Sequence, residues 1–452
     1  MSFQLDNATT WIERLNPFAV QRPDWQQLLK WLLALGACHT AAKIGASWLQ
    51  VRRMRRVLAD VPATKLPTNT FLGFATSILD NRHRFHDFME DITEGRPMSK
   101  MFGLAFEPNM VVVVVKDPDC IKHFLKDNFD GYTKPHQGDN LQLDMVKKWI
   151  GDGIFLLQHG PGAQDGGRAW HMQRKISSNI FSRDNFRKNM RNVFVDRGHR
   201  MCALLNKRLD KEVDMQQMFF CYTMDSITRI FFGEESDTMS GRACEYGEAF
   251  DTAQRAVMDY MRKAEKDLYL MTYLPWPLGA PGLTGLASRL HAKASKDYRT
   301  FERACSTLDK KSEEIIRTCR ADPNISKRSD LLALFIRAEE REKFTSKYLR
   351  DMILNFMIAG RDTTACLLSW AFFELATRPE IQHQLIAEID GRLPGGREPT
   401  WDLLTENSMP YLNGVIYEAL RLHPPIPIDI KWAQADDVFP NGQKVPKGAM
   451  VW

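Results

Sequence analysis

Apolar residues recur three or four positions apart through most of the chain between residues 185 and 390. Clear examples are VDMQQMFFCYTMDSITRIFFG, EYGEAFDTAQRAVMDYM and YRTFERACSTLDKKSEEIIRTC. This spacing is typical of helices that turn one apolar face toward a core. We therefore predict that this part of the chain is almost entirely helical.

Short strands are predicted on both sides of this helical region. Residues 110–115 read MVVVVV, and such a β-branched run favours a strand. DPD at 117–119 is expected to cap the helix CIKHFLKDNF that follows it. Residues 430–452 return to short strands, with Asn441 and Gly442 as a turn signal. The predicted fold class is mainly α with small β-sheets, one of which combines both ends of the chain.

The N-terminal segment contains the membrane candidate of the sequence. Residues 25–49 are mostly apolar, but Lys30, His39 and Lys43 interrupt a stretch barely as long as the roughly 20 residues that a bilayer requires. A basic cluster of the kind that stays on the cytoplasmic side follows it: Arg52, Arg53, Arg55 and Arg56. We expect residues 1–60 to form a membrane anchor. The alternatives are an amphipathic helix on a membrane or on the protein body, and a cleaved targeting peptide.

A single large domain is expected over residues 61–452, after a linker marked by Pro62 and Pro67. A helix is predicted early in it, around FATSILDNRHRFHDFMEDI. At 452 residues and 44% hydrophobic, the chain can bury a large core. Its 61 basic and 56 acidic residues give a net charge of +5, which is too mild to indicate a nucleic-acid partner.

The cysteines are scattered singly, so they suggest a reducing compartment and not a disulfide framework. There is no CxxC pair, no zinc-binding spacing and no GxxxxGK phosphate loop. The eight cysteines are Cys38, Cys120, Cys202, Cys221, Cys244, Cys305, Cys319 and Cys366.

One apolar helix, MILNFMIAGRDTTACLLSWAFFEL, carries polar residues at its centre. Gly360 costs about 1 kcal/mol relative to Ala inside a helix, and Thr363 or Thr364 can bond back to a carbonyl one turn earlier. With Ala359, Gly360 would form a shallow groove, and Asp362 and Thr363 could relay protons to a small ligand there. The alternative is a kinked core helix in which Asp362 is paired in a salt bridge.

Two further pairs lie at helical spacing. Glu418 and Arg421 in YEALRLHPP are three apart, which predicts either a surface ion pair or, if buried, a structural staple. Trp170 and Arg174 in AWHMQRK are four apart. An indole N–H beside a guanidinium makes a double donor for a carboxylate, and the alternative is a Trp stacked by an Arg at a helix surface.

The chain resembles the cysteinate-ligated haem monooxygenases, the cytochrome P-450 superfamily. The resemblance rests on the order and spacing of three motifs: Trp-x-x-x-Arg, AGRDTT, and EALR with its proline pair. The resemblance covers most of the chain. FLKDNFDGYTKP, GDGIF, RKISSNIFS and AFDTAQ are similar to the branch whose members are chiefly fatty-acid and alkane omega-hydroxylases. The resemblance implies the P-450 fold and a haem b cofactor.

On the distal side of the haem, the resemblance implies that Asp362 and Thr363 are the acid and alcohol that steer protons to the oxygen being activated. Ala359 and Gly360 would leave room for that oxygen. Arg361 adds a charge to this motif, and we expect it to point away from the groove toward solvent.

At the haem edge, the resemblance implies that Trp170, Arg174 and Lys431 hold a propionate. It also implies that Glu418 and Arg421 form a structural pair near the proximal side. The loop before Trp170 looks longer than is usual for the family.

The implied activity is hydroxylation of a fatty acid or related long-chain aliphatic near its terminal carbon. It would use O2 and two electrons from an NADPH-dependent flavoprotein reductase. The protein is expected to be attached to a membrane, that of the endoplasmic reticulum, with its catalytic domain facing the cytoplasm. Loops around 132–150 and helices around 215–260 would form the lid and the substrate channel.

The family's axial ligand is a Cys in a Phe-x-x-Gly-x-Arg-x-Cys-x-Gly loop, and none of the eight cysteines has that setting. We expect no metal ligand within this chain, an axial Cys beyond Trp452, and a P-450 fold that is C-terminally incomplete. The alternatives are a catalytically inactive, haem-less binding protein, and a monooxygenase of another lipophilic substrate such as a sterol or a terpenoid.

Overall fold

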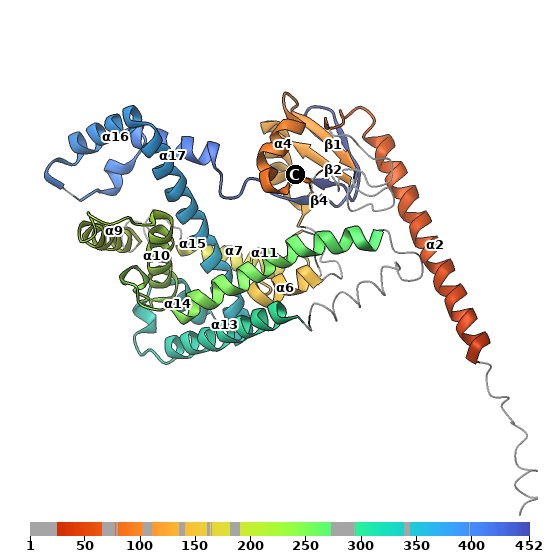
Figure 1. Cartoon of the computed structure of the whole chain (residues 1–452), viewed down its shortest axis with the longest axis horizontal. Helices are drawn as coiled ribbons and strands as arrows, with labels where there is room; N and C mark the ends of the chain where they lie inside the picture. The colour runs from red at the N-terminus through yellow and green to blue at the C-terminus, as the bar shows by residue number, and fades with distance from the viewer. Residues whose placement is uncertain are drawn as a thin grey trace, which may run out of the picture.

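Helices and strands separate into two parts in the computed structural model of the chain, as Figure 1 shows. The strands gather beside α2, and the long helices lie to the other side of them. The structure describes residues 25–65, 77, 80–102, 111–134, 141–160, 163, 165–180, 190–272, 293, 295–338, 344–396 and 398–452. Pro67 and residues 74–76, 78 and 79 of the helix expected before Phe85 lie outside these residues.

A five-stranded sheet combines both ends of the chain, as predicted. Its strand order is β1-β2-β7-β4-β3, in which β2 and β7 are parallel and the other neighbours are antiparallel. The strands are β1 (Met98–Phe102), β2 (Val111–Val115), β3 (Tyr132–Thr133), β4 (Lys431–Ala433) and β7 (Met450–Val451). A separate hairpin joins β5 (Asp437–Val438) to β6 (Lys444–Val445) through the predicted turn at Asn441 and Gly442.

The valine run of β2 is buried on both faces of this sheet. Val111, Val113 and Val115 pack into one apolar cluster, and Val112 and Val114 pack into another. Alternate residues of a strand point to opposite faces, so a continuous apolar run fits a strand that is covered on both sides. Helix α4 (Phe85–Thr93) contributes Phe88, Met89 and Ile92 to the second cluster.

The first cluster includes the end of α2 (Trp25–Val57), a helix that projects away from the strands in Figure 1. Val51 and Met54 of α2 are buried there, together with Leu58 and Val61. The boundary predicted after residue 60 therefore divides one core, and the packed body begins at Val51 or earlier. Across the part of the chain that the structure describes, no helix is both long and apolar enough to cross a bilayer.

Two of the arginines that suggested a membrane flank bind the protein body. Arg53 forms an ion pair with Asp436 at 2.6 Å. The guanidinium of Arg55 lies 4.8 Å from the centre of the Phe102 ring. These contacts fix the end of α2 against the strands.

The rest of the described chain is mainly helical, which confirms the predicted fold class. Asp117 caps α5 (Pro118–Lys122) by accepting a hydrogen bond from the Cys120 amide, as DPD predicted, although the helix continues as a π-turn over His123–Asp127. The other helices are α6 (Leu141–Ile150), α7 (Arg168–Ile180), α9 (Arg191–Asn206), α10 (Met215–Ile227), α11 (Glu245–Thr272), α13 (Lys296–Arg320), α14 (Leu331–Ala338), α15 (Ser346–Thr377), α16 (Pro379–Arg392) and α17 (Pro410–Leu422).

Helix α15 is the central element of the helical part (Figure 1). Thr345 caps it by accepting from the Tyr348 amide, and its first half is buried almost all round. Gly360 lies at its middle, where a Cβ atom would come within 2.2 Å of Ile227 Cδ1 on α10. The missing side chain therefore lets α10 and α15 approach closely at this point.

Candidate functional site

Three cationic side chains converge from three separate segments. Lys134 follows β3, Arg174 lies on α7 and Lys431 begins β4. Burial, together with the nearby positive charges of Lys431 and Arg174, lowers the pKa of Lys134 to about 7, although the carboxylate of Asp429 opposes this shift. Asp429 accepts from the Lys431 ammonium at 2.7 Å with each carboxylate oxygen. A cluster in which one lysine is held close to neutrality is suited to an anionic ligand.

Aromatic rings complete one side of this cationic cluster. The Lys134 ammonium lies 5.8 Å from the centre of the Trp170 ring. His159 stacks on Phe129, with ring centres 4.0 Å apart, and its ring centre is 5.1 Å from that of Trp170. The structure thus brings the predicted residues Trp170, Arg174 and Lys431 to one place and adds Lys134, which sequence reasoning missed.

The loop over residues 151–157 connects this cluster to α15. Lys134 donates to the carbonyls of Ile154 and Leu157. From the other side, Asp351 accepts from the Asp152 amide at 2.9 Å, and the buried Asn355 accepts from the Phe155 amide at 3.1 Å.

Glycines allow this close approach of the loop to α15. A Cβ atom on Gly151 would come within 1.9 Å of the Asp351 carboxylate, and one on Gly153 within 2.1 Å of the Asn355 amide. Gly151 also has a positive φ of 71°. The GDGIF motif is therefore a loop fixed between the cationic cluster and the turn of α15 that precedes Ala359.

Asp362 and Arg361 on α15 both contact α11. Asp362 accepts from the Gln254 amide at 2.7 Å, and Arg361 pairs with Asp251 at 2.5 Å. Burial raises the pKa of Asp362, while Arg361 and Gln254 oppose the rise. The expectation that Arg361 points to solvent is wrong, because the residue is only 7% exposed and its guanidinium lies near the rings of Phe220 and Phe250.

Thr363 donates to the Ala359 carbonyl at 2.7 Å, the backward bond that the sequence suggested. The helix is continuous from Ser346 to Thr377, so the expected opened turn does not form. The close approach of Ile227 to Gly360 accounts for a glycine at this position.

Glu418 and Arg421 form the pair that their spacing predicts. Two hydrogen bonds, of 2.6 and 2.8 Å, join the guanidinium to the carboxylate. The side chains are 56% and 66% exposed. The structure therefore agrees with the surface-pair alternative and not with a buried staple.

The fully buried cysteines do not provide a ready metal ligand. Burial raises the pKa of the Cys305 thiol to about 12 and those of Cys120 and Cys319 to about 11, whereas metals bind the thiolate. Among the residues that the structure describes, no three His, Cys, Asp or Glu side chains are grouped to hold a metal ion.

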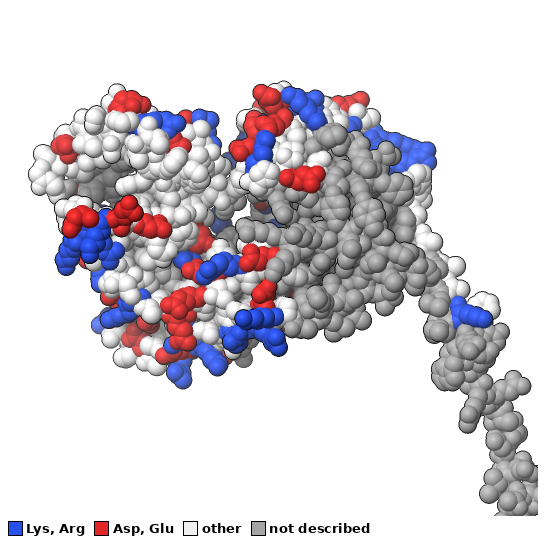
Figure 2. All heavy atoms as spheres, in the orientation of Figure 1, with Lys and Arg blue, Asp and Glu red and all other residues white. Residues whose placement is uncertain are grey.

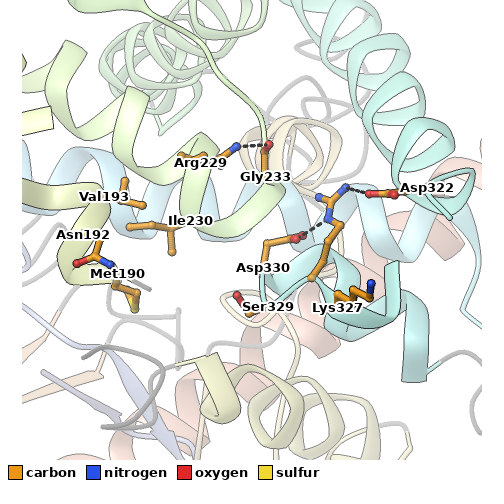
Figure 3. Close-up of a pocket in the computed structure, with 11 residues that line it drawn as sticks. Met190, Asn192, Val193, Arg229, Ile230, Gly233, Asp322, Lys327, Ser329 and Asp330 are labelled. Atoms are coloured by element: carbon orange, nitrogen blue, oxygen red, sulfur yellow. Dashed lines mark hydrogen bonds and ion pairs between the residues drawn. The ribbon is translucent and has the colours of Figure 1, made fainter. Parts of the chain in front are cut away.

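A surface pocket of about 470 Å³ lies away from these residues, lined by the start of α9, by the turn that follows α10 and by residues 322–330 between α13 and α14 (Figure 3). Arg328 is held there by Asp330 at 2.7 Å and Asp322 at 3.2 Å. The charged lining of this pocket does not suit a large apolar cofactor, because pockets that bind cofactors are lined mostly by apolar side chains. Over the described part of the face in Figure 2, acidic and basic side chains are interspersed.

The sequence profile of the family described as Cytochrome P450 matches residues 65–452. The chain belongs to the cytochrome P450 family. This confirms the resemblance on which the site residues were chosen. P450 enzymes are haem-dependent monooxygenases, so the expected cofactor is also that of the family.

Similar P450 proteins come from fungi and plants. Cytochrome P450 monooxygenase cyp1 of Mycosarcoma maydis is 31% identical over 75% of this chain and 51% of its own length. Cytochrome P450 704B1 of Arabidopsis thaliana is 28% identical over 92% of this chain and 80% of its own length. The chain thus spans about half the length of the first relative. The crystal structure of a cytochrome P450DA heme domain matches with a TM-score of 0.61 and 18% identity, over 86% of this chain and 76% of that one, which shows a shared fold.

The described residues fit one end of a haem. The cationic cluster of Lys134, Arg174 and Lys431 can bind its carboxylates, because ammonium and guanidinium donors make strong bonds to carboxylates. The axial thiolate of the family has no counterpart among the described cysteines.

Proposed function

We propose that this chain is part of a monooxygenase that hydroxylates fatty acids, or related long-chain aliphatics, near the terminal carbon. It uses O2 and electrons from an NADPH-dependent flavoprotein reductase. The observation that carries the proposal is the cationic cluster and its link, through loop 151–157, to the helix that bears Asp362 and Thr363.

Bound haem would supply electron transfer and oxygen activation, and the protein supplies position and protons. Lys134, Arg174 and Lys431 neutralise the haem carboxylates, with Trp170 covering the cluster. This fixes the orientation of the ring without a part in the chemistry.

Asp362 holds a proton more readily than an exposed aspartate, because burial raises its pKa. Thr363 donates its hydroxyl hydrogen to the Ala359 carbonyl, so its oxygen remains able to accept a hydrogen bond from a neighbouring donor. In the proposed mechanism Asp362 stores the proton, and Thr363 takes up one proton on its oxygen while it releases its own hydroxyl proton from the Ala359 carbonyl to the reacting oxygen; the surrounding apolar side chains limit water.

The substrate class rests on the motifs FLKDNFDGYTKP, GDGIF and AFDTAQ, which are similar to those of omega-hydroxylases. The same likeness supports attachment to the endoplasmic reticulum membrane through the N-terminal segment that precedes Val51. We also propose that the axial cysteine follows Trp452 in a longer protein.

The test uses that longer protein, supplied with haem, reductase and NADPH. Fatty acids of graded length should be hydroxylated near the terminal methyl, whereas sterols and terpenoids should not. Product from sterols but not from fatty acids would refute the substrate assignment. Replacing Thr363 by Ala should consume NADPH with less product and more peroxide, and unchanged coupling would remove Thr363 from the mechanism.

A second candidate function is a haem-less binding protein for an anionic lipophilic ligand. It is favoured by the raised thiol pKa values of the buried Cys120, Cys305 and Cys319, which disfavour the thiolate form at these three positions. The Soret band under carbon monoxide decides between the two, because cysteinate ligation shifts that band to long wavelength. A longer protein that binds no haem would support this candidate.

A further inference from the structure

Helix α11 presents two polar side chains to the centre of α15. Asp251 and Gln254 are three positions apart and therefore lie on the same face of α11. Gln254 reaches Asp362, and Asp251 reaches Arg361. The AFDTAQ and AGRDTT motifs, more than 100 residues apart, thus meet through two side-chain contacts.

Arg361 divides its charge between two carboxylates. Its Nη1 lies 2.5 Å from Asp251 Oδ1 and 3.4 Å from Asp362 Oδ1. Its buried Nε has no acceptor among the described atoms. The guanidinium is therefore bound more closely to Asp251, and Asp362 receives only part of the stabilisation that a full ion pair would give.

The charged and titratable groups around Asp362 have opposite effects on it. Arg361 and the Gln254 amide favour the carboxylate, whereas burial and the negative charge of Asp251 favour the acid. Cys366, on the next turn of α15, carries a thiol whose pKa is raised by burial and by Asp362. The side chains of Asp362 and Arg361 are 16% and 8% exposed, so their interaction is only weakly screened by solvent, whereas Asp251 is 38% exposed and its effect is partly screened.

We propose that Gln254 and Asp251 are positioning residues through which α11 controls the proton affinity of Asp362, in opposite directions. Gln254 stabilises the carboxylate by donating to Oδ2. Asp251 stabilises the acid, both as a like charge and by holding Arg361 away from Asp362. A displacement of α11 along α15 changes both contacts and hence the charge of Asp362.

The role of Asp362 as a proton donor rests on the proposed function, but its titration does not. The 452-residue chain can be labelled with ¹³C at the aspartate carboxyls, and the Asp362 resonance assigned by its loss in Asp362→Asn. NMR titration should show a higher pKa for Asp362 in Gln254→Leu and a lower one in Asp251→Asn. Glu248→Gln is the matched control, because it removes one exposed carboxylate from α11 a turn before Asp251 and should leave the pKa unchanged.

Opposite shifts in the two variants support the proposal. Shifts of the same sign, or no shift in either, overturn it. If Gln254→Leu does not fold, the isosteric Gln254→Glu serves instead. It should raise the pKa of Asp362 through like-charge repulsion, and an unchanged or lowered pKa overturns the proposal.

A separate experiment tests the proposed function, and its outcome can be distinguished from that of the NMR titration. In the haem-containing protein, Gln254→Leu should move the pH profile of coupling between NADPH use and product toward higher pH, with an unchanged KM for the fatty acid. An absent thiolate spectrum would refute the proposed function and leave the NMR result standing. An active enzyme whose Asp362 titrates identically in all variants would refute this inference alone.

Discussion

Asn355→Ala removes the amide that joins α15 to loop 151–157. Asn355 is fully buried, and its amide nitrogen donates to the Ile150 carbonyl at 2.8 Å. Its amide oxygen accepts from the Phe155 amide at 3.1 Å. The substitution leaves the Ile150 carbonyl at the end of α6 and the Phe155 amide in the loop without their partner, while the Asp351 carbonyl, the third partner, keeps its bond within the helix.

Each buried polar group left unsatisfied costs about 1–3 kcal/mol. Phe155 is 41% exposed, so water can partly replace the lost partner of its amide. We therefore expect Asn355→Ala to lower the free energy of unfolding by about 2–4 kcal/mol.

Urea unfolding of the chain measures this loss, and amide hydrogen exchange of residues 150–157 shows whether it is local. Exchange should accelerate in this loop more than in β2 or α13. Asn324→Ala is the matched control, because Asn324 is exposed and should change neither measurement. A loss below about 0.5 kcal/mol with unchanged exchange would mean that Asn355 does not hold the loop.

Three further changes test other parts of the structure. Gly360→Ala should destabilise the chain, because the new Cβ overpacks Ile227 at a cost of about 1–3 kcal/mol, which outweighs the gain of about 1 kcal/mol in helix propensity. In thermal melts, this cost should be smaller when the substitution is combined with Ile227→Ala. Additive costs of the two substitutions would contradict the contact. Lys134 has a folded-state pKa of about 7, below the ordinary value of 10.5. The unfolded chain therefore binds more protons between these values, and stability should rise as pH increases from about 7 toward 10.5; denaturation across this range should show a smaller rise in Lys134→Met, and an equal rise would assign the effect elsewhere. Glu418→Ala should leave the urea midpoint unchanged, because the pair is exposed, and a clear decrease would show that the pair supports the fold.

Local patterns along the chain were sufficient to predict much of the fold. The valine run of β2 is a strand, Asn441 and Gly442 form a turn, and the apolar spacing between residues 185 and 390 produces helices. Each of these features depends on residues close in sequence. The burial of β2 on both faces also explains why its apolar residues do not alternate with polar ones.

The site could be predicted only where a motif was recognised. Trp170 and Arg174 are four residues apart, but Lys134 gains its importance from Lys431, almost 300 residues later. A lysine in TKP after a short strand carries no sign of such a neighbour. Arg361 shows the same limit, because its partner Asp251 is 110 residues away. A charge in an apolar helix indicates a partner but does not identify it.

The central claim is that Lys134 and Arg174 bind the carboxylates of haem. Titration of the chain with haemin, followed by quenching of tryptophan fluorescence, measures this binding. Removing a charged donor should cost about 1.5–3 kcal/mol, so Lys134→Gln and Arg174→Gln should each raise Kd roughly 10- to 100-fold. The exposed neighbour Lys175 provides the control, and Lys175→Gln should leave Kd unchanged. Equal Kd values for all three variants and the wild type would contradict the claim.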